Sequence, residues 1–258
     1  MSKDRMPKLV EPRPKKGRSG KIIFLLLVFF LILLAVLFFR SELSKVDRIE
    51  IGGYRYTTAE QIEQALGLKA GDPFFSVTKA TLSSRIEELP YVEKAIVDKH
   101  FPGYVGVEVI EFPEIAYSLG TGGQIEAILA NAANVQLIPG ESLRYLPVLS
   151  GWEDRAKELD ALCKALSQIP APLLADISQI KPDPTVSYPD RIRMYTRSYF
   201  EVVTTIAYLP NKLDYMRAII YEYEPGIITM LEANSHTSYQ ALEAEEADNG
   251  ADSETTDG

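Results

Sequence analysis

The stretch IIFLLLVFFLILLAVLFF, residues 22–39, is eighteen residues long and contains no charge, no glycine, no proline and no hydrogen-bonding side chain. At about 1.5 Å per residue, a helix of this length would extend about 27 Å, close to the roughly 30 Å hydrocarbon core of a bilayer. The alternative is a buried helix of a soluble protein, but such helices are seldom apolar on every face over this length. The sequence therefore predicts one transmembrane helix over 22–39.

Charge is distributed unevenly on the two sides of this stretch. Residues 1–39 carry eight Lys and Arg and two acids, whereas the rest of the chain carries 19 basic and 34 acidic residues, a net charge of −15. Basic residues beside a span keep that side in the cytoplasm. We therefore expect a disordered, basic cytoplasmic tail over 1–21, a single-pass type II orientation, and an extracytoplasmic location for the bulk of the chain.

A cleaved signal peptide is the alternative to a permanent anchor. The apolar run is long for a signal peptide, and the following residues, FFRSELSKV at 38–46, offer no small-x-small cleavage site. Both features favour an uncleaved anchor.

Composition limits the ligands and the chemistry of the segment beyond the span. Its acidic balance argues against nucleic acid as a partner. The chain has one cysteine, Cys163, so no intramolecular disulfide can form. Cys163 falls on the apolar face of an expected helix, which favours a buried small side chain over a reactive thiol.

Residues 46–111 predict a small α+β unit. Strands are expected at 46–51, 92–99 and 104–111, with a helix between Thr57 and Gly67 and another at 78–89. The first helix has a capping-box pattern in which Thr57 caps the helix and Glu60 reaches back to the cap. The order strand, helix, helix, strand, strand places both helices on one face of a three-stranded sheet.

Short motifs occur through this unit in a fixed order. They are I-x-I-x-G at 49–53, G-D-x-F-F at 71–75, L-P-x-V-x-x-A at 89–95, F-P at 101–102, and Glu111, Pro113 and Ala116 at the end of the third strand. Together they resemble the POTRA domain of the FtsQ/DivIB family of bacterial cell-division proteins, which follows a single N-terminal anchor with a basic tail. The resemblance implies a βααββ POTRA domain at 44–115.

The remaining sequence predicts a second, β-rich α+β domain at 116–236, and the segment YLPVLSGW at 145–152 resembles the L-P-x-L-x-G segment of the family. A turn is expected at 120–123, a hairpin without firm strand boundaries at 124–138, and an amphipathic helix at 153–168 that ends at Pro170 and Pro172. Further strands are expected around 177–180, 192–196, 200–207 and 227–231, and a helical stripe at 213–220. Arg191, Arg193 and Arg197 would give one strand a basic outer face.

The end of the chain is acidic. Residues 242–258 contain seven acids and no base. We therefore expect a disordered acidic tail over 237–258, and an acidic interaction tail is the alternative.

Several short motifs resemble parts of catalytic or ligand-binding sites. Residues 76–79 spell S-x-x-K, but the S-D-N and K-T-G companions of penicillin-binding enzymes are missing, so a helix cap is the better interpretation. The glycines at 120–123 lack the strand-to-helix context of a dinucleotide site. The two histidines, His100 and His236, and the acids show no metal-ligand spacing. The sequence predicts no enzyme, no cofactor, no metal and no small-molecule substrate.

The edge strands of a β-sheet could still bind a partner protein. An exposed edge strand carries unpaired N–H and C=O groups that can accept a strand of a partner. The resemblance implies a non-catalytic scaffold of the divisome that joins proteins of the FtsL and FtsB/DivIC types, with the partner adding to the C-terminal sheet edge. Carried over to this chain, that edge comprises Ile227, Ile228, Thr229, Met230 and Leu231, with Tyr199, Phe200 and Val202 on a nearby strand.

The expected function is therefore that of a bitopic scaffold in the cell membrane at the division septum. One alternative is a POTRA-bearing secretion or translocation chaperone, which tandem POTRA units or a membrane barrel would favour. The other is a membrane-anchored envelope enzyme or receptor. The sequence contains one POTRA-like unit and no recognised catalytic motif.

Overall fold

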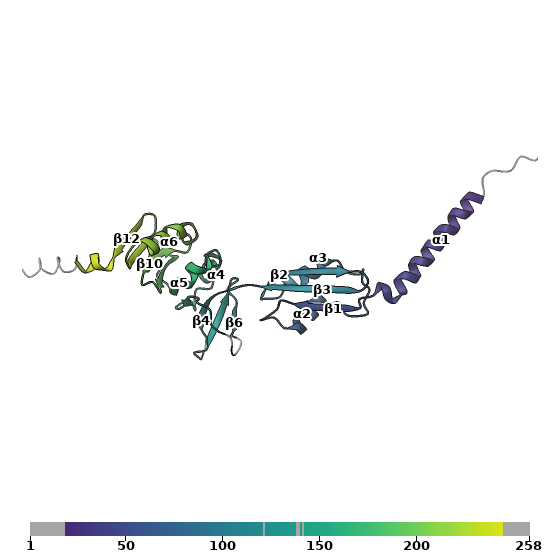
Figure 1. Ribbon diagram of the computed structural model, residues 1–258, viewed down its shortest axis with the longest axis horizontal. Coiled ribbons are helices and arrows are strands. Elements are labelled where there is room, and N and C mark those ends of the chain that lie inside the picture. Colours follow the sequence, from purple (N-terminus) through teal and green to yellow (C-terminus); the bar gives the residue numbers. More distant parts are fainter. Residues whose placement is uncertain (1–18, 121, 138–139, 141, 245–258) are drawn as a thin grey trace, which may run out of the picture.

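A computed structural model describes residues 19–120, 122–137, 140 and 142–244 (Figure 1). Helix α1, Ser19–Arg40, includes the whole of the predicted span. No residue of its most apolar stretch is buried within the protein, which suits a helix surrounded by lipid. Residues 1–18 of the expected basic tail lie outside the described residues.

The first folded unit has the predicted order of elements. Its helices and strands are β1 (Arg48–Gly52), α2 (Ala59–Leu66), α3 (Lys79–Glu87), β2 (Val92–His100) and β3 (Tyr104–Glu111). The sheet order is β1-β3-β2, with β1 parallel and β2 antiparallel to the central strand β3. The predicted α+β class and βααββ arrangement are confirmed.

The cap of α2 lies one residue later than expected. The hydroxyl of Thr58 accepts a hydrogen bond from the Gln61 N–H at 3.3 Å, and the Gln61 side chain accepts one from the Thr58 N–H at 2.9 Å. Both Thr57-x-x-Glu60 and Thr58-x-x-Gln61 fit a capping box. Thr57 is buried instead, so tertiary packing decides between two patterns that the sequence offers equally.

Alternation along the strands gives the first sheet one buried and one open face. Ile62 and Leu66 of α2, with Leu82 and Ile86 of α3, are fully buried against it. The inward side chains of β3 are Val105, Val107 and Val109. The open face carries the exposed Ile96 and Ile110, as in antiparallel sheets that meet solvent on one side.

The second unit is built on a nine-stranded sheet. Its strands are β4 (Glu114–Leu119), β5 (Ile125–Leu129), β6 (Asn134–Gln136), β7 (Val148–Leu149), β8 (Ile177–Pro182), β9 (Arg191–Thr196), β10 (Glu201–Thr205), β11 (Gly226–Met230) and β12 (Asn234–Ser238). Their order in the sheet is β12-β11-β10-β9-β8-β7-β4-β5-β6. The helical segments are α4 (Ala156–Leu166), α5 (Ala171–Asp176), η2 (Leu209–Lys212) and α6 (Leu213–Glu222), and a further short one, η1 (Glu42–Ser44), follows α1.

Helix α5 corrects the expectation that the chain is broken at Pro170 and Pro172. Pro170 is the N-cap of this helix, and Pro172 lies in its first turn. Proline is tolerated there because the N–H groups of a first helical turn have no partner within the helix. The same residues that end one helix therefore begin another.

The C-terminal end of the sheet corrects two further expectations. Strand β11 is not the last strand, since β12 follows it through a short hairpin. Residues 237 and 238, which were expected in the acidic tail, belong to β12, and residues 239–244 are helical. Residues 245–258 of that tail lie outside the described residues.

The chain passes from the first sheet to the second between Glu111 and Glu114. The expected division into 44–115 and 116–236 stays a prediction, but Glu114 already pairs with Leu129 in the second sheet. The two units form a row in which α1 lies at one end of the described chain and β12 toward the other (Figure 1).

Polar contacts connect the two units. The Glu114 carboxylate, whose side chain is 3% exposed, accepts hydrogen bonds from Arg55 Nη1 at 2.5 Å and from the Tyr56 hydroxyl. The side-chain amide of Asn131 donates to the Pro90 carbonyl at 2.8 Å. These contacts join the β5–β6 hairpin and β4 to the first unit.

Candidate functional site at the outer edge of β12

The residues expected at the sheet edge lie one strand inside it. Strand β11 is hydrogen-bonded on both sides, in parallel to β10 and in antiparallel to β12. The expected edge at 227–231 is therefore corrected to β12. The cause is that the sequence NSHTS at 234–238 is polar and has no apolar alternation, so it does not signal a strand.

The expected site residues divide by burial. Phe200, Val202, Ile228 and Met230 point into the core and are buried, whereas Ile227 and Thr229 are half-buried on the opposite face. Leu231 lies beyond β11, and its carbonyl accepts a hydrogen bond from the Lys212 ammonium group. Tyr199 is 78% exposed and adopts a positive φ of 68° in the turn between β9 and β10. Most of these side chains are therefore unavailable to a partner.

Two backbone hydrogen bonds show which groups of β12 face outward. The Tyr239 N–H donates to the Pro225 carbonyl at 3.2 Å, and the Leu231 N–H donates to the Ala233 carbonyl at 3.3 Å. Hydrogen-bonded and non-hydrogen-bonded pairs alternate along an antiparallel ladder. The register then places Ser235 and Thr237 in hydrogen-bonded pairs with β11.

The backbone groups of the alternate residues, Asn234, His236 and Ser238, consequently face away from β11. Within the described part of the chain, no strand pairs with that side of β12. This row of N–H and C=O groups is the candidate site.

Aromatic side chains border this edge. The His236 ring lies 5.4 Å from the Tyr223 ring and 6.0 Å from the Phe200 ring, and its Nε2 is 3.1 Å from the Glu224 carbonyl. Tyr239 follows directly after β12, and burial raises the pKa of its phenol, with the charge of Glu201 acting in the same direction. Tyrosine is common where proteins meet, because one side chain offers both apolar area and a hydroxyl.

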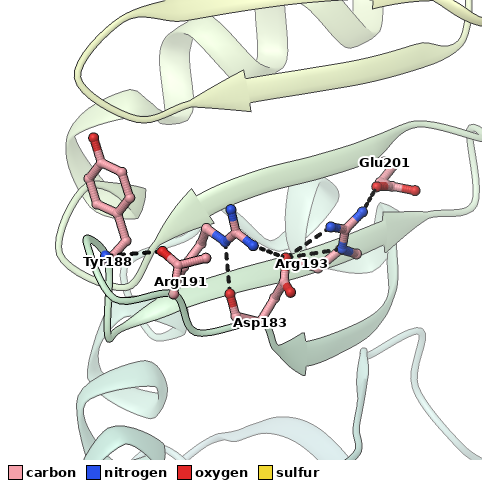
Figure 2. A network of polar contacts seen from close by, with 6 residues as sticks. Asp183, Tyr188, Arg191, Arg193 and Glu201 are labelled. Carbon is pink, nitrogen blue, oxygen red and sulfur yellow. Dashed lines mark hydrogen bonds and ion pairs between the residues drawn. The ribbon is translucent and has the colours of Figure 1, made fainter.

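The outer face of β9 is not the basic surface that the sequence suggests. Figure 2 shows the Asp183 carboxylate between two guanidinium groups. Its Oδ2 lies 3.0 Å from Arg191 Nη2 and 2.9 Å from Arg193 Nη2, and Arg193 also pairs with Glu201. Arg197 instead donates to the carbonyls of Ala175 and Ile177. Carboxylates therefore compensate the charges of Arg191 and Arg193, and Arg197 holds backbone carbonyls, so all three arginines stabilise the sheet and its loops.

The motif at residues 76–79 forms the start of a helix. The Thr78 hydroxyl accepts from the Thr81 N–H and so caps α3, and the Ser76 hydroxyl donates to the Pro73 carbonyl at 2.7 Å. Lys79 forms an ion pair with Asp98 at 3.0 Å. Ser76 and Lys79 therefore contact different partners and not each other's side chain in the way that a catalytic S-x-x-K pair would.

The one cysteine of the chain, Cys163, is buried. Burial raises the pKa of the Cys163 thiol to about 12, which keeps it protonated near neutral pH. Among the residues that the structure describes, no group of three His, Cys, Asp or Glu side chains is placed to hold a metal ion.

Comparisons with known proteins agree with the motifs in the first unit. The family model "POTRA domain, FtsQ-type" matches residues 44–112. The cell division protein DivIB of Paenibacillus polymyxa (strain E681) is 40% identical over 256 residues, which cover 99% of this chain and 100% of that protein. DivIB of Geobacillus kaustophilus (strain HTA426) is 31% identical, with 84% of this chain and 82% of that protein covered.

One solved structure is also similar, the major extracytoplasmic domain of the trans isomer of DivIB from Geobacillus stearothermophilus. It is 27% identical, covers 43% of this chain and 93% of that chain, and gives a TM-score of 0.33, which is too low to support a conclusion about the fold. The sequence matches extend over the whole chain, and they confirm the resemblance given by the motifs. The chain belongs to the DivIB family of cell division proteins.

Proposed function

We propose that this protein is a bitopic scaffold of the division machinery that holds a partner by strand addition to the outer edge of β12. The scaffold acts without catalysis, and its partners are membrane proteins of the FtsL and FtsB/DivIC types. It lies in the cell membrane at the division septum, with α1 as its single span and the N-terminus in the cytoplasm. Both folded units are extracytoplasmic.

The observation that carries this proposal is the row of outward backbone groups at Asn234, His236 and Ser238. A sheet edge with unpaired N–H and C=O groups is a template for another strand. Main-chain hydrogen bonds would supply affinity, and the side chains that flank the edge would supply specificity. Tyr223, whose ring lies 5.4 Å from the His236 ring, provides such a flanking side chain.

The position of the edge suits this role. Strand β12 lies far along the chain from α1, and both folded units are between them (Figure 1). A partner anchored in the same membrane would have to reach β12 with an extended extracytoplasmic segment.

Proline at position 236 tests strand addition directly. His236→Pro removes an outward N–H donor but leaves the hydrogen-bonded pairs at Ser235 and Thr237 in place. We expect this variant to lose co-purification with the coiled-coil partner from solubilised membranes. Circular dichroism and thermal unfolding should show that both units remain folded.

His236→Ala is the matched control, because it removes the ring but keeps the backbone donor. We expect it to retain most of the partner. Equal losses for the two variants would show that the partner binds the side chain, and unchanged binding by His236→Pro would refute strand addition at β12.

A further inference from the structure

Five phenylalanine rings meet where α1 joins the first folded unit. We call them the junction cluster: Phe38, Phe39, Phe74, Phe75 and Phe101. Phe38, at the end of α1, lies 6.4 Å from the Phe75 ring and 6.2 Å from the Phe101 ring. Phe75 and Phe101 stack on each other at 6.1 Å and 27°. The cluster therefore connects the end of the span with two loops of the POTRA unit.

Three of these rings are largely uncovered by protein. Phe39 is 61% exposed, Phe75 is 56% exposed and Phe101 is 52% exposed, and the neighbouring Leu43 is exposed as well. Removing such apolar side chains from water is favourable. A contiguous exposed apolar patch commonly marks a contact with protein or membrane.

Hydrogen bonds fix the loop that carries Phe75. The Phe74 N–H donates to the Ser44 carbonyl at 2.8 Å, and the Val46 N–H donates to the Asp72 carbonyl at 2.8 Å. The Lys99 ammonium group donates to the Phe74 and Val77 carbonyls from the other side. The loop is thus held against the segment that leaves α1.

The turn that carries Phe101 is held in the same way. The Asp47 N–H donates to the Gly103 carbonyl at 2.8 Å. Gly103 has a positive φ of 68°, and a Cβ at this position would lie 2.8 Å from the Asp47 backbone nitrogen. The outward position of Phe101 is therefore built into the turn.

The place of the cluster identifies what covers it. Phe38 and Phe39 are the last apolar residues of α1 before Arg40. The other rings of the cluster lie beside these two, and so at the level where α1 leaves the hydrocarbon core. Arg40 ends α1, and Lys45 and Arg48 follow within eight residues, where they pair with Glu42 and Glu50. Aromatic rings with nearby cationic side chains are typical of membrane–water interfaces.

We propose that Phe75 and Phe101 of the POTRA unit, together with Phe39, insert into the interfacial layer of the leaflet in which α1 ends. The unit then rests on the membrane through two loops as well as through the connection to α1. This contact fixes its orientation and so the direction in which β12 is presented. The proposal depends on α1 being a membrane span, as in the proposed function.

Tryptophan substitutions in the full chain test this contact. The protein has one tryptophan, Trp152, which is buried in the second unit and gives a constant background. Phe75→Trp and Phe101→Trp keep an aromatic ring in the cluster. Each variant is reconstituted alone into vesicles that contain phospholipids brominated either near the headgroup or deep in the acyl chain, and its emission is compared with that in unbrominated vesicles.

Tyr54→Trp is the matched control. Tyr54 is an exposed aromatic residue of the same unit, but it follows the end of β1 that is distant from the 101–103 turn. We expect the shallow bromines to remove about half of the additional emission of Phe75→Trp and Phe101→Trp and almost none of that of Tyr54→Trp.

Phe30→Trp, within α1, separates this inference from the span itself. Deep bromines should quench Phe30→Trp strongly if α1 spans the membrane. If they do, and Phe75→Trp and Phe101→Trp lose no more emission than Tyr54→Trp, the membrane contact is overturned and the span is retained. If Phe30→Trp is not quenched, both the span of α1 and the membrane contact of the POTRA unit are overturned.

Discussion

Glu114 is the residue on which the connection between the two units most depends. Its carboxylate is buried and accepts hydrogen bonds from Arg55 and Tyr56 of the first unit. A buried carboxylate is tolerated only where charged or hydrogen-bonding partners compensate for lost hydration. This role could not be read from the sequence, because the partners are more than fifty residues apart.

Replacing this carboxylate tests its contribution to the junction. Glu114→Gln keeps the shape but removes the charge that faces Arg55, and we expect it to lower the free energy of unfolding by about 1–3 kcal/mol. Denaturant-induced unfolding measures the change. Glu108→Gln, on the open face of the first sheet, is the control and should leave stability nearly unchanged. Equal effects would show that the buried ion pair has no special role.

Single residues also show where sequence patterns are ambiguous. Thr57 and Thr58 each begin a capping-box pattern, and packing selects Thr58. The cap at Thr78 and the C-cap glycine at Gly67, with its left-handed φ of 59°, follow from local chemistry alone. Local hydrogen bonds are predictable from the sequence when only one residue can make them.

Strand β12 is an element that sequence patterns do not reveal. It is short and polar, and it owes its conformation to β11 rather than to an apolar face of its own. Helix α5 is missed for a related reason, since prolines end helices and also begin them. The strands of the first sheet, by contrast, alternate or cluster β-branched residues, and their prediction is confirmed.

Gly226 controls how closely β12 approaches β11. A Cβ at this position would lie 2.1 Å from the Thr237 carbonyl oxygen and 2.6 Å from the Ser238 Cα. We expect Gly226→Ala to displace β12, to increase amide exchange in residues 234–238 and to weaken partner capture, while the first unit remains unchanged.

Gly52→Ala is the control for this substitution, because nothing lies within 4 Å of a Cβ at position 52. Hydrogen exchange analysed by mass spectrometry compares the two variants. Unchanged protection of β12 in Gly226→Ala would show that the strand does not depend on this close approach.

The described chain consists of the apolar helix α1, the POTRA unit and the nine-stranded sheet, in that order (Figure 1). The apolar helix α1 and the POTRA unit could be predicted because each rests on local sequence: an uninterrupted apolar run, and motifs at fixed spacing. The order of strands in the second sheet could not be predicted from the sequence. Strand β7 pairs with β4 on one side and with β8 on the other, and both partners are distant from it in sequence. The outer edge at β12 could not be predicted for a separate reason, since the polar sequence of this strand does not signal a strand.

The central claim is that a partner strand pairs with the outer edge of β12. Residue-resolved amide exchange of the full chain, with and without the coiled-coil partner, tests it most directly. We expect the amides of Asn234, His236 and Ser238 to become protected on binding, while those of Ser235 and Thr237 are protected in both states. Exchange at the three outward amides that stays the same with the partner bound would contradict strand addition.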